Sequence, residues 1–238
     1  MLNKWQCRVA PSLGGGFEGT PASVWGTKDY TNDTDPTCFF GLYGLPDFYA
    51  LKTHKGEKHI LWAGSDIRHF VKGYWLDENG GIRLVPLPLA QWINKYCESW
   101  CENKVEAEEL MKMGIYANII PSFLGDVNDF PISEKRTDKK RYYSSVSGDN
   151  FELYNWEKIN NLAMVNPEVE YHLYGNTKDW VAPVNVIVHG RVDKNVMNEG
   201  IKSMTGCVRL VDMEGCSELV VKATLWGQEV ISAIDYPF

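Results

Sequence analysis

Short apolar runs alternate with amphipathic stretches along most of the 238 residues. Runs rich in β-branched and aromatic residues predict strands, and apolar residues spaced by three or four predict helices between them. The strands are expected over 5–10, 37–43, 59–63, 98–102, 117–121, 142–147, 170–175, 185–190 and 207–211, followed by an apolar run from 230. The helices are expected over 46–53, 87–96, 105–113, 151–165, 196–203 and 218–225. This alternation is typical of α/β proteins with parallel, doubly wound sheets.

Two segments give more local expectations. Residues 17–36 are rich in Gly, Thr, Asn and Asp, so we expect a loose segment there. The helix over 105–113 has apolar residues near the helical period, and Glu106, Glu108 and Glu109 lie between them. These glutamates are expected to form a solvated face.

A polar stretch near the middle of the chain marks the expected domain boundary. Residues 133–141 carry five basic residues and no large apolar one, which is typical of a solvated linker. Contact of these cations with phosphate or an acidic acceptor is the alternative, and we favour the linker. We therefore expect a first domain over 1–132 and a second domain over 142–238.

Composition and charge narrow the class of protein. Apolar residues make up 44% of the chain and charged residues 23%, as in soluble globular proteins. The net charge of −7 argues against a nucleic-acid scaffold, which needs basic surface. Six scattered cysteines predict reduced thiols, and Cys97 and Cys101 lack the second pair that a zinc site needs. Because the sequence shows neither an apolar run of membrane-spanning length nor a signal peptide, the expected location is cytoplasmic.

The stretch over 207–231 combines the features of an anion site. An apolar strand is followed by a polar turn, by a helix with Ser217 as its N-cap, and by Gly227 as a left-handed C-terminal cap. Free amides and the helix dipole at the start of such a helix favour a negatively charged ligand. Ordinary βαβ packing gives the same pattern, so the geometry alone leaves both interpretations open.

The residues of this stretch resemble the donor-sugar segment of GT-B fold glycosyltransferases. Glu214-Gly215 before the helix and Gly227-Gln-Glu-Val-Ile231 after it fit the family pattern, whereas Lys222 stands where that pattern has Glu. The resemblance is mainly to retaining members and extends over nearly the whole chain. It implies an α/β protein of two Rossmann-like, doubly wound parallel-sheet domains, at a length that is minimal for the family.

The resemblance also implies which residues meet the donor. Glu214 is expected to approach the donor sugar as a catalytic residue. His189 is expected before a helix beside the nucleotide base, with an ordinary strand position as the alternative. For Lys222 we weigh contact with a phosphate against an ion pair with Glu218 one turn earlier, and we favour the ion pair. The residues expected to bind the donor or its phosphates are Gly215, Cys216, Ser217, Glu218, Lys222, Arg191 and Arg209.

In the first half, the Gly-Ser-Asp loop after the strand over 59–63 is similar to the equivalent GT-B loop. Loops beyond the carboxyl ends of parallel strands hold ligands in α/β proteins, so Asp66 is a candidate catalytic acid or base on the acceptor side. A helix cap explains Asp66 equally well. A triple glycine earlier in the chain either lets backbone amides approach a ligand or forms a flexible loop. The expected acceptor-side loop residues are Gly14, Gly15, Gly16, Ser65 and His69.

Together these expectations define a function. The chain is expected to be a hexosyl- or pentosyltransferase that uses a UDP- or GDP-sugar as substrate and needs no cofactor. No Asp-x-Asp motif stands in a suitable place, and the resemblance implies transfer without a metal ion. The expected acceptor is a glycan, a lipid-linked glycan, a protein or a modified nucleobase.

Two alternative functions stay open at this point. One is a catalytically weak GT-B-like binding or partner subunit, which Lys222 and the short carboxyl end motivate, and which allows for a homo- or hetero-oligomer. The other is a transferase that acts on modified DNA bases, and the basic residues over 135–141 are the reason to consider it.

Overall fold

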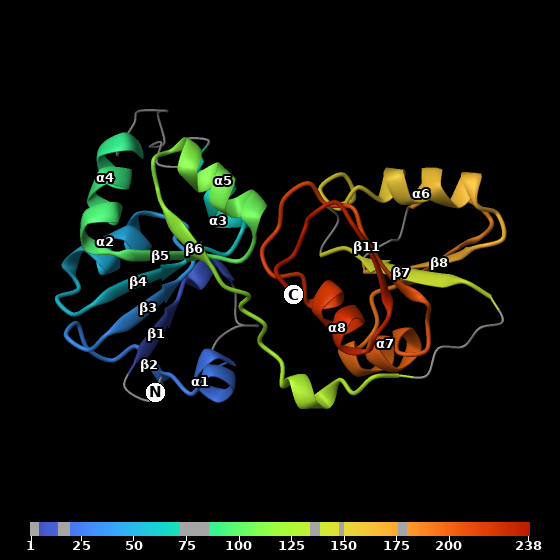
Figure 1. Ribbon diagram of the computed structural model, residues 1–238, viewed down its shortest axis with the longest axis horizontal. Coiled ribbons are helices and arrows are strands. Elements are labelled where there is room, and N and C mark those ends of the chain that lie inside the picture. Colours follow the sequence, from blue (N-terminus) through green and yellow to red (C-terminus); the bar gives the residue numbers. More distant parts are fainter. Residues whose placement is uncertain (1–4, 14–19, 72–85, 134–138, 148–149, 176–179) are drawn as a thin grey trace. The chain divides into compact units, whose positions relative to one another are not determined.

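A computed structural model describes residues 5–13, 20–71, 86–133, 139–147, 150–175 and 180–238 (Figure 1). By its internal contacts the chain divides into two compact units. The first unit comprises Met1–Gly125 with Met213–Cys216 and Pro237, and the second comprises Asp126–Asp212 with Ser217–Tyr236 and Phe238. Residues 134–138 of the expected linker lie outside the described residues, so the linker stays a prediction.

The first unit is built on a six-stranded parallel sheet with the order β2-β1-β3-β4-β5-β6. Its strands are β1 Gln6–Val9, β2 Lys28–Asp29, β3 Thr37–Phe40, β4 Lys58–Leu61, β5 Glu98–Cys101 and β6 Ala117–Ile119. Its helices are α1 Thr20–Trp25, α2 Leu45–Thr53, α3 Ser65–Val71, α4 Pro86–Tyr96 and α5 Lys104–Lys112, with a 3-10 turn η2 at Pro11–Leu13.

The strand order explains which face each helix of the first unit covers. Crossovers between parallel strands are right-handed, so helices that follow a run of strands in one direction cover one face. From β3 to β6 the strands proceed in one direction, and α2 to α5 pack on the same core around Phe39, Ile60 and Trp62 (Figure 1). The β1-to-β2 connection runs the other way, and its Trp25 packs with Phe40 and Leu61 on the opposite face.

The second unit has a five-stranded parallel sheet with the order β11-β10-β7-β8-β9. Its strands are β7 Arg141–Ser145, β8 Glu170–Tyr174, β9 Val186–Gly190, β10 Gly206–Arg209 and β11 Glu229–Ser232. Its helices are α6 Trp156–Val165, α7 Lys194–Ile201 and α8 Glu218–Leu225, with a 3-10 turn η3 at Val127–Asp129. The core with α6 lies on one face and the core with α7 and α8 on the other (Figure 1).

Both sheets confirm the predicted α/β class with two doubly wound parallel sheets. The expected loose segment over 17–36 instead contains α1 and β2, which the hydrophobic pattern did not predict because these short elements lack a long apolar run. The expected helix over 151–165 begins later, at Trp156, since Asn155 before it has a left-handed backbone with φ of 52°. Within the described parts of the chain, none of the helices has the length and apolar character of a membrane span.

The expected solvated face of α5 is wrong for Glu106, whose side chain is fully buried. Asn103 caps α5 by accepting from the Glu106 amide at 3.1 Å. The Glu106 side chain turns back and accepts from the Glu102 amide at 2.7 Å. This reciprocal arrangement resembles a capping box, which satisfies two amides at the start of a helix. Glu106 therefore serves the helix terminus instead of facing solvent.

Candidate functional site

A pocket of about 480 Å³ opens at the carboxyl ends of β7, β8 and β10 in the second unit. Strand order reverses between β7 and β10, since β8 and β9 continue on one side and β11 on the other. Open α/β sheets bind their ligands at such a switch point. We call this the cationic pocket and define it by six lining residues, namely Arg191, Lys194, Arg209, Ser217, Glu218 and Lys222.

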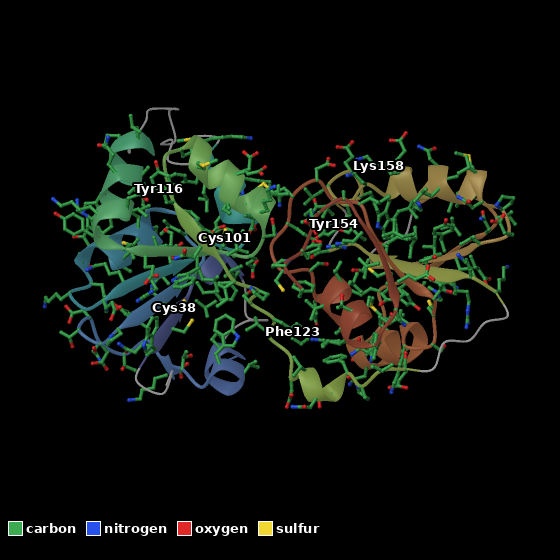
Figure 2. The ribbon with its side chains drawn as sticks, viewed as in Figure 1. Cys38, Cys101, Tyr116, Phe123, Tyr154 and Lys158 are labelled. Atoms are coloured by element: carbon green, nitrogen blue, oxygen red, sulfur yellow. The ribbon has the colours of Figure 1, made fainter. Side chains whose placement is uncertain are left out.

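Arg209 ends β10 and forms one wall of the cationic pocket. Its side chain is largely buried, and Nη1 donates to the carbonyl oxygen of Ser145 at the end of β7, at 2.6 Å. The guanidinium carbon lies 4.3 Å from the centre of the Tyr154 ring, which Figure 2 labels. A planar cation stacked on an aromatic ring is fixed in orientation, because ring and hydrogen bond act together. Arg209 thus presents a preorganised charge at the switch point.

Glu218 and Lys222 face each other along α8. The Lys222 Nζ lies 2.9 Å from Oε1 of Glu218, which confirms the predicted ion pair. The same Nζ donates to Oδ1 of Asn198 on α7 at 2.9 Å. Lys194, also on α7, places its Nζ 2.7 Å from Oε1 of Glu218. Two lysines from two helices therefore hold one carboxylate.

Burial and the neighbouring charges shift the pKa values of both Glu218 and Lys222. Burial lowers the pKa of Lys222, although the Glu218 carboxylate opposes that effect. Burial acts to raise the pKa of Glu218, but hydrogen bonds from Lys194 and the charge of Lys222 outweigh it, so the net pKa is lowered. The lowered pKa keeps the Glu218 carboxylate ionised at neutral pH, and its negative charge favours the protonated form of Lys222 against the effect of burial.

The start of α8 contributes backbone amides to the cationic pocket. Ser217 occupies the N-cap position as predicted, with an extended backbone, but its side chain makes no capping hydrogen bond. Gly227 after the helix has φ of 71°, which confirms the expected left-handed cap. An N-terminus without a side-chain cap leaves first-turn amides for an anion, and the helix dipole favours negative charge there.

The structure brings together only some of the residues expected to bind the donor. Arg191, Arg209, Ser217, Glu218 and Lys222 all line the cationic pocket. The described lining does not include Glu214, Gly215 and Cys216. These three residues precede Ser217 and belong to the first unit. Their expected roles stay predictions.

Sequence reasoning missed the contribution of α7. Lys194 and Asn198 both line the cationic pocket, yet the helix was expected to begin only at residue 196. Asp193 caps α7 by accepting from the Asn195 amide at 2.8 Å. An Asp followed by helix-forming residues is a recognisable N-cap signal, and it would have placed Lys194 on the helix.

Asp66 is held in the first turn of α3 by backbone amides. Its two oxygens accept from Leu42 at 2.9 Å, Ala63 at 3.0 Å and Ile67 at 2.8 Å, and its side chain is fully buried. Burial raises the pKa of Asp66 to about 6, although these amides oppose the shift. Asp66 lies inside α3 and not at its N-cap, and two of its three amide donors follow the strands β3 and β4, so the geometry favours a structural role in joining these strand ends to the helix.

The other described residues that were expected in the acceptor-side loop, Ser65 and His69, both lie on α3. The Ser65 hydroxyl lies 2.6 Å from the Tyr43 hydroxyl, half-buried at the start of α3. His69 lies further along α3 with an exposed side chain. Gly14, Gly15 and Gly16 lie outside the described residues, so their expected role stays a prediction.

A group of buried carboxyls in the first unit was not foreseen. Burial raises the pKa of Glu102, at the end of β5, to about 8. Burial also raises the pKa of Glu106 well above its ordinary value, and the neighbouring Glu102 adds to the shift. Oε1 of Glu106 has no hydrogen-bond partner among the described residues. Carboxyls in such a setting favour the protonated form at neutral pH.

Two histidines stack beside the cationic pocket. Nδ1 of His172 lies 2.8 Å from Nε2 of His189, and the His189 ring is stacked on Tyr174 with a centroid distance of 4.3 Å. Tyr174 lines the pocket. Burial, together with His189, lowers the pKa of His172 to about 4. His189 therefore lies in a packed ring stack, and its expected place beside a nucleotide base stays a prediction.

The first unit contains another pocket, of about 390 Å³, with a different chemistry. Trp5, Trp25 and Trp100 form much of its wall, with His59 and Leu61. Among the residues that the structure describes, this lining has no Arg or Lys to meet a phosphate. Among the described residues, no group of three or more His, Cys, Asp or Glu side chains is placed to hold a metal ion. Of these two pockets, the cationic pocket is the one whose described lining suits an anionic ligand.

Comparisons with known proteins bear on the fold. No family model and no curated protein matches the sequence. Among solved structures, the chain is similar to sucrose-phosphate synthase from Thermosynechococcus elongatus, with a TM-score of 0.58 and 12% identity over 83% of this chain and 56% of that one. It is also similar to a TarM mutant from S. aureus solved with UDP, with a TM-score of 0.52 and 14% identity over 86% and 43%.

A third solved structure is matched over more of its length. It is Anabaena HepE in complex with UDP-glucose, with a TM-score of 0.50 and 10% identity over 96% of this chain and 79% of that one. The chain spans about half the length of the first two structures. At these identities the similarity establishes the fold, which is that of GT-B glycosyltransferases with two Rossmann-like sheets.

Proposed function

We propose that this protein is a glycosyltransferase that moves a sugar from a nucleotide-activated donor to an acceptor, with the donor bound in the cationic pocket. The observation that carries the proposal is the pocket itself. Four cationic side chains and the start of α8 converge at the switch point of a GT-B fold sheet. Two of the solved structures with this fold contain UDP or UDP-glucose.

The chemistry of glycosyl transfer explains why such a pocket would be needed. As the glycosidic bond to the donor breaks, the leaving diphosphate gains negative charge. Preorganised cations and amides stabilise that charge without the cost of reorientation. Arg209 is fixed by Ser145 and Tyr154, while Arg191 is exposed at the pocket and reaches a bound ligand more freely. Each charge-assisted hydrogen bond contributes about 1.5–3 kcal/mol.

Transfer without a divalent ion is part of the proposal. Arg191, Lys194, Arg209 and Lys222 supply cationic charge around the position proposed for the diphosphate, which is the electrostatic task a metal ion performs in other transferases. Glu214 stays our candidate for contact with the donor sugar. For Asp66 we propose a structural role in its loop, because backbone amides occupy both of its oxygens.

Two measurements test the proposal. The first is the shift in melting temperature of the full chain with UDP, GDP, UDP-glucose, UDP-N-acetylglucosamine and GDP-mannose. The second is release of UDP or GDP from those donors, with and without EDTA, across glycan, lipid-linked glycan, protein and nucleobase acceptors. We expect one nucleotide class to stabilise the chain and its sugar to be turned over in EDTA. Absence of both effects would reject the proposal.

A binding or partner subunit is the second candidate function. The observation in its favour is that Lys222 is occupied by Glu218 and Asn198, where the resembled family has a carboxylate. Stabilisation by a nucleotide without turnover of any donor would favour this candidate. Light scattering would show whether the chain forms an oligomer, and cell fractionation would test the cytoplasmic location that we also propose.

A further inference from the structure

The pocket of about 390 Å³ in the first unit has no part in the proposed function. Its described lining contains no Lys, Arg, Asp or Glu, so a charged ligand would lose its hydration there without gaining a partner. We call it the tryptophan pocket and define it by six lining residues, namely Trp5, Trp25, Thr27, Cys38, His59 and Trp100.

The floor of the tryptophan pocket is one face of the first sheet. Cys38 of β3, which Figure 2 labels, is in register with His59 of β4, and Leu61 of β4 is in register with Trp100 of β5. Side chains alternate along a strand, so these residues face away from the core that contains Ile60. Parallel sheets are normally covered on both faces. On this face the helix α1 is six residues long, and Cys38 and Trp100 are only half-buried.

Most polar atoms in the rings of the tryptophan pocket are already paired. Nε1 of Trp100 donates to Nδ1 of His59 at 3.2 Å, and Nε2 of His59 lies 3.0 Å from Oε1 of Glu57. Nε1 of Trp25 donates to the carbonyl oxygen of Phe123 at 3.3 Å. A sugar would bring several hydroxyl groups to a site with few free partners, and burial of unpaired hydroxyls is unfavourable. The lining therefore suits a ligand that is mainly apolar.

The rings of the lining are held in place by other rings. The Trp5 ring lies against His59 with a centroid distance of 4.1 Å, and His59 is stacked with Trp100 at 6.4 Å. Trp25 packs on Phe40 at 5.6 Å. Aromatic pairs gain stability beyond the area that they bury. A planar ring also loses less conformational freedom on binding than a flexible chain does, so these walls favour an aromatic ligand.

One hydroxyl of the lining lacks a hydrogen bond. Thr27 lies between α1 and β2 and is 8% exposed, and its Oγ1 has no partner among the residues that the structure describes. A buried hydroxyl without a partner is destabilising. A ligand hydroxyl can pair with it in either direction, because a hydroxyl both donates and accepts.

We propose that the tryptophan pocket binds an uncharged planar aromatic molecule that carries one hydroxyl group. Its rings pack against Trp5, Trp25 and Trp100, and its hydroxyl pairs with Thr27. The volume of about 390 Å³ lies within the range of small-molecule sites, roughly 300–1,000 Å³. All the lining residues belong to the first unit, so this site does not depend on the cationic pocket, and failure of either proposal leaves the other standing.

Isothermal titration calorimetry of 2-naphthol on the full chain tests the class of ligand, with three competitors that displace bound 2-naphthol. Naphthalene should bind about tenfold more weakly, because the Thr27 hydroxyl then stays unpaired. Naphthalene-2-sulfonate should also bind at least about tenfold more weakly, since the described lining offers its charge no cation. Octan-1-ol should bind more weakly as well, because its chain is flexible. These comparisons need no variant, so they stand even where a substitution disturbs folding.

Variants then assign the binding to the tryptophan pocket. Thr27→Val keeps the shape of the side chain and removes the hydroxyl, so the ratio of the naphthalene Kd to the 2-naphthol Kd should fall to about one- to twofold. Trp5→Leu should weaken the binding of both probes about tenfold, since an aromatic wall is lost. Thr224→Val and Tyr49→Leu are the matched controls, because both residues are exposed and outside the lining, and both Kd values should stay at those of the wild type.

Several results would overturn the proposal. One is the absence of saturable binding of 2-naphthol to the wild-type chain. Another is a naphthalene ratio that persists in Thr27→Val, because the ligand hydroxyl would then pair with a different group. Unchanged affinity in Trp5→Leu would place the ring outside the pocket, and tighter binding of octan-1-ol would replace the aromatic class by a chain. A dimer in light scattering that excludes 2-naphthol would assign this face to a second copy of the chain instead.

Discussion

Oε1 of Glu218 lies 2.9 Å from Nζ of Lys222 one helical turn later, yet the two side chains differ sharply in exposure. The Lys222 side chain is 5% exposed and the Glu218 side chain 51%. Loss of Glu218 should therefore affect the stability of the fold differently from loss of Lys222. A buried ammonium without its carboxylate is destabilising, whereas an exposed carboxylate without its ammonium is solvated.

We predict an asymmetric response to substitutions in this pair. Glu218→Leu should lower the free energy of unfolding by about 1–2 kcal/mol, because Lys222 loses its counter-charge. Lys222→Met should change it by less than about 0.5 kcal/mol, since Lys194 still contacts Glu218 and methionine suits the buried position. Urea unfolding of both single variants and the double variant measures the difference. Equal costs would contradict the description of the pair.

The buried carboxyls of the first unit predict a loss of stability as pH rises. Burial raises the pKa of Glu102 to about 8 and that of Glu106 above its ordinary value, so the folded state binds these protons more tightly than the unfolded state. The resulting stability is complete below the ordinary pKa of glutamate. It is lost as pH rises toward about 8, by up to about 1.4 kcal/mol per pH unit for each group.

Glu106→Gln should reduce that slope, because an amide carries no proton to lose and can still accept from the Glu102 amide. Urea unfolding at pH 5, 6, 7 and 8 gives the slope for variant and wild type. Glu108→Gln is the control, since Glu108 is exposed on the same helix. An unchanged slope in Glu106→Gln would show that this glutamate titrates normally.

The histidine stack predicts a loss of stability in acid. Burial and His189 lower the pKa of His172 to about 4, so the folded state takes up this proton less readily than the unfolded state. Stability from this site is present above pH 6.5 and falls as pH drops toward 4, by up to about 1.4 kcal/mol per unit. Glu170, Arg141 and Lys139 also act on this imidazole.

His172→Gln should flatten the dependence between pH 6.5 and 4.5, because glutamine does not titrate. His189→Gln should flatten it in part, since it removes one cause of the lowered pKa of His172. Thermal melting over this range is the measurement. A wild-type chain whose His172 protonates near pH 6.5 in a nuclear magnetic resonance titration would refute the prediction.

The two arginines of the cationic pocket should differ in their effect on stability. Arg209→Met removes the bond to Ser145 and the stacking on Tyr154, so it should cost about 1–2 kcal/mol of stability and also weaken nucleotide binding at least tenfold. Arg191→Met should weaken binding similarly and leave the melting temperature unchanged, since Arg191 is exposed. Calorimetric binding with melting curves separates the two effects. Unchanged nucleotide affinity in both variants would place the phosphates elsewhere.

Local signals in the sequence were sufficient for most elements of the second unit. Helix α8 spans Glu218–Leu225 as expected, because an N-cap serine and a C-terminal glycine delimit it. The Glu218–Lys222 pair follows from helical spacing alone. Local signals could not predict the features that depend on contacts between distant parts of the chain.

Glu106 shows why the rest could not be predicted. A charged residue on an amphipathic helix is normally solvated, and its burial depends on Glu102 and on the surrounding core, which a helical pattern does not contain. Asp66 was open to two interpretations for a similar reason, since its amide partners Leu42 and Ala63 come from the ends of two different strands. The pairing of Lys194 with Glu218 likewise joins two helices.

The reversal of strand order in the second sheet has a consequence for synthesis on the ribosome. Strand β7 lies between β8 and β10, and β10 begins more than sixty residues after β7 along the chain. One edge of β7 therefore has no neighbour until residues 206–209 have left the exit tunnel, whereas the first sheet has all its strands once residue 119 emerges. Domains fold as units during translation. In the growing second unit, the central strand β7 therefore keeps one edge without a partner until β10 has been synthesised. We expect chaperone contact with the growing chain to concentrate there.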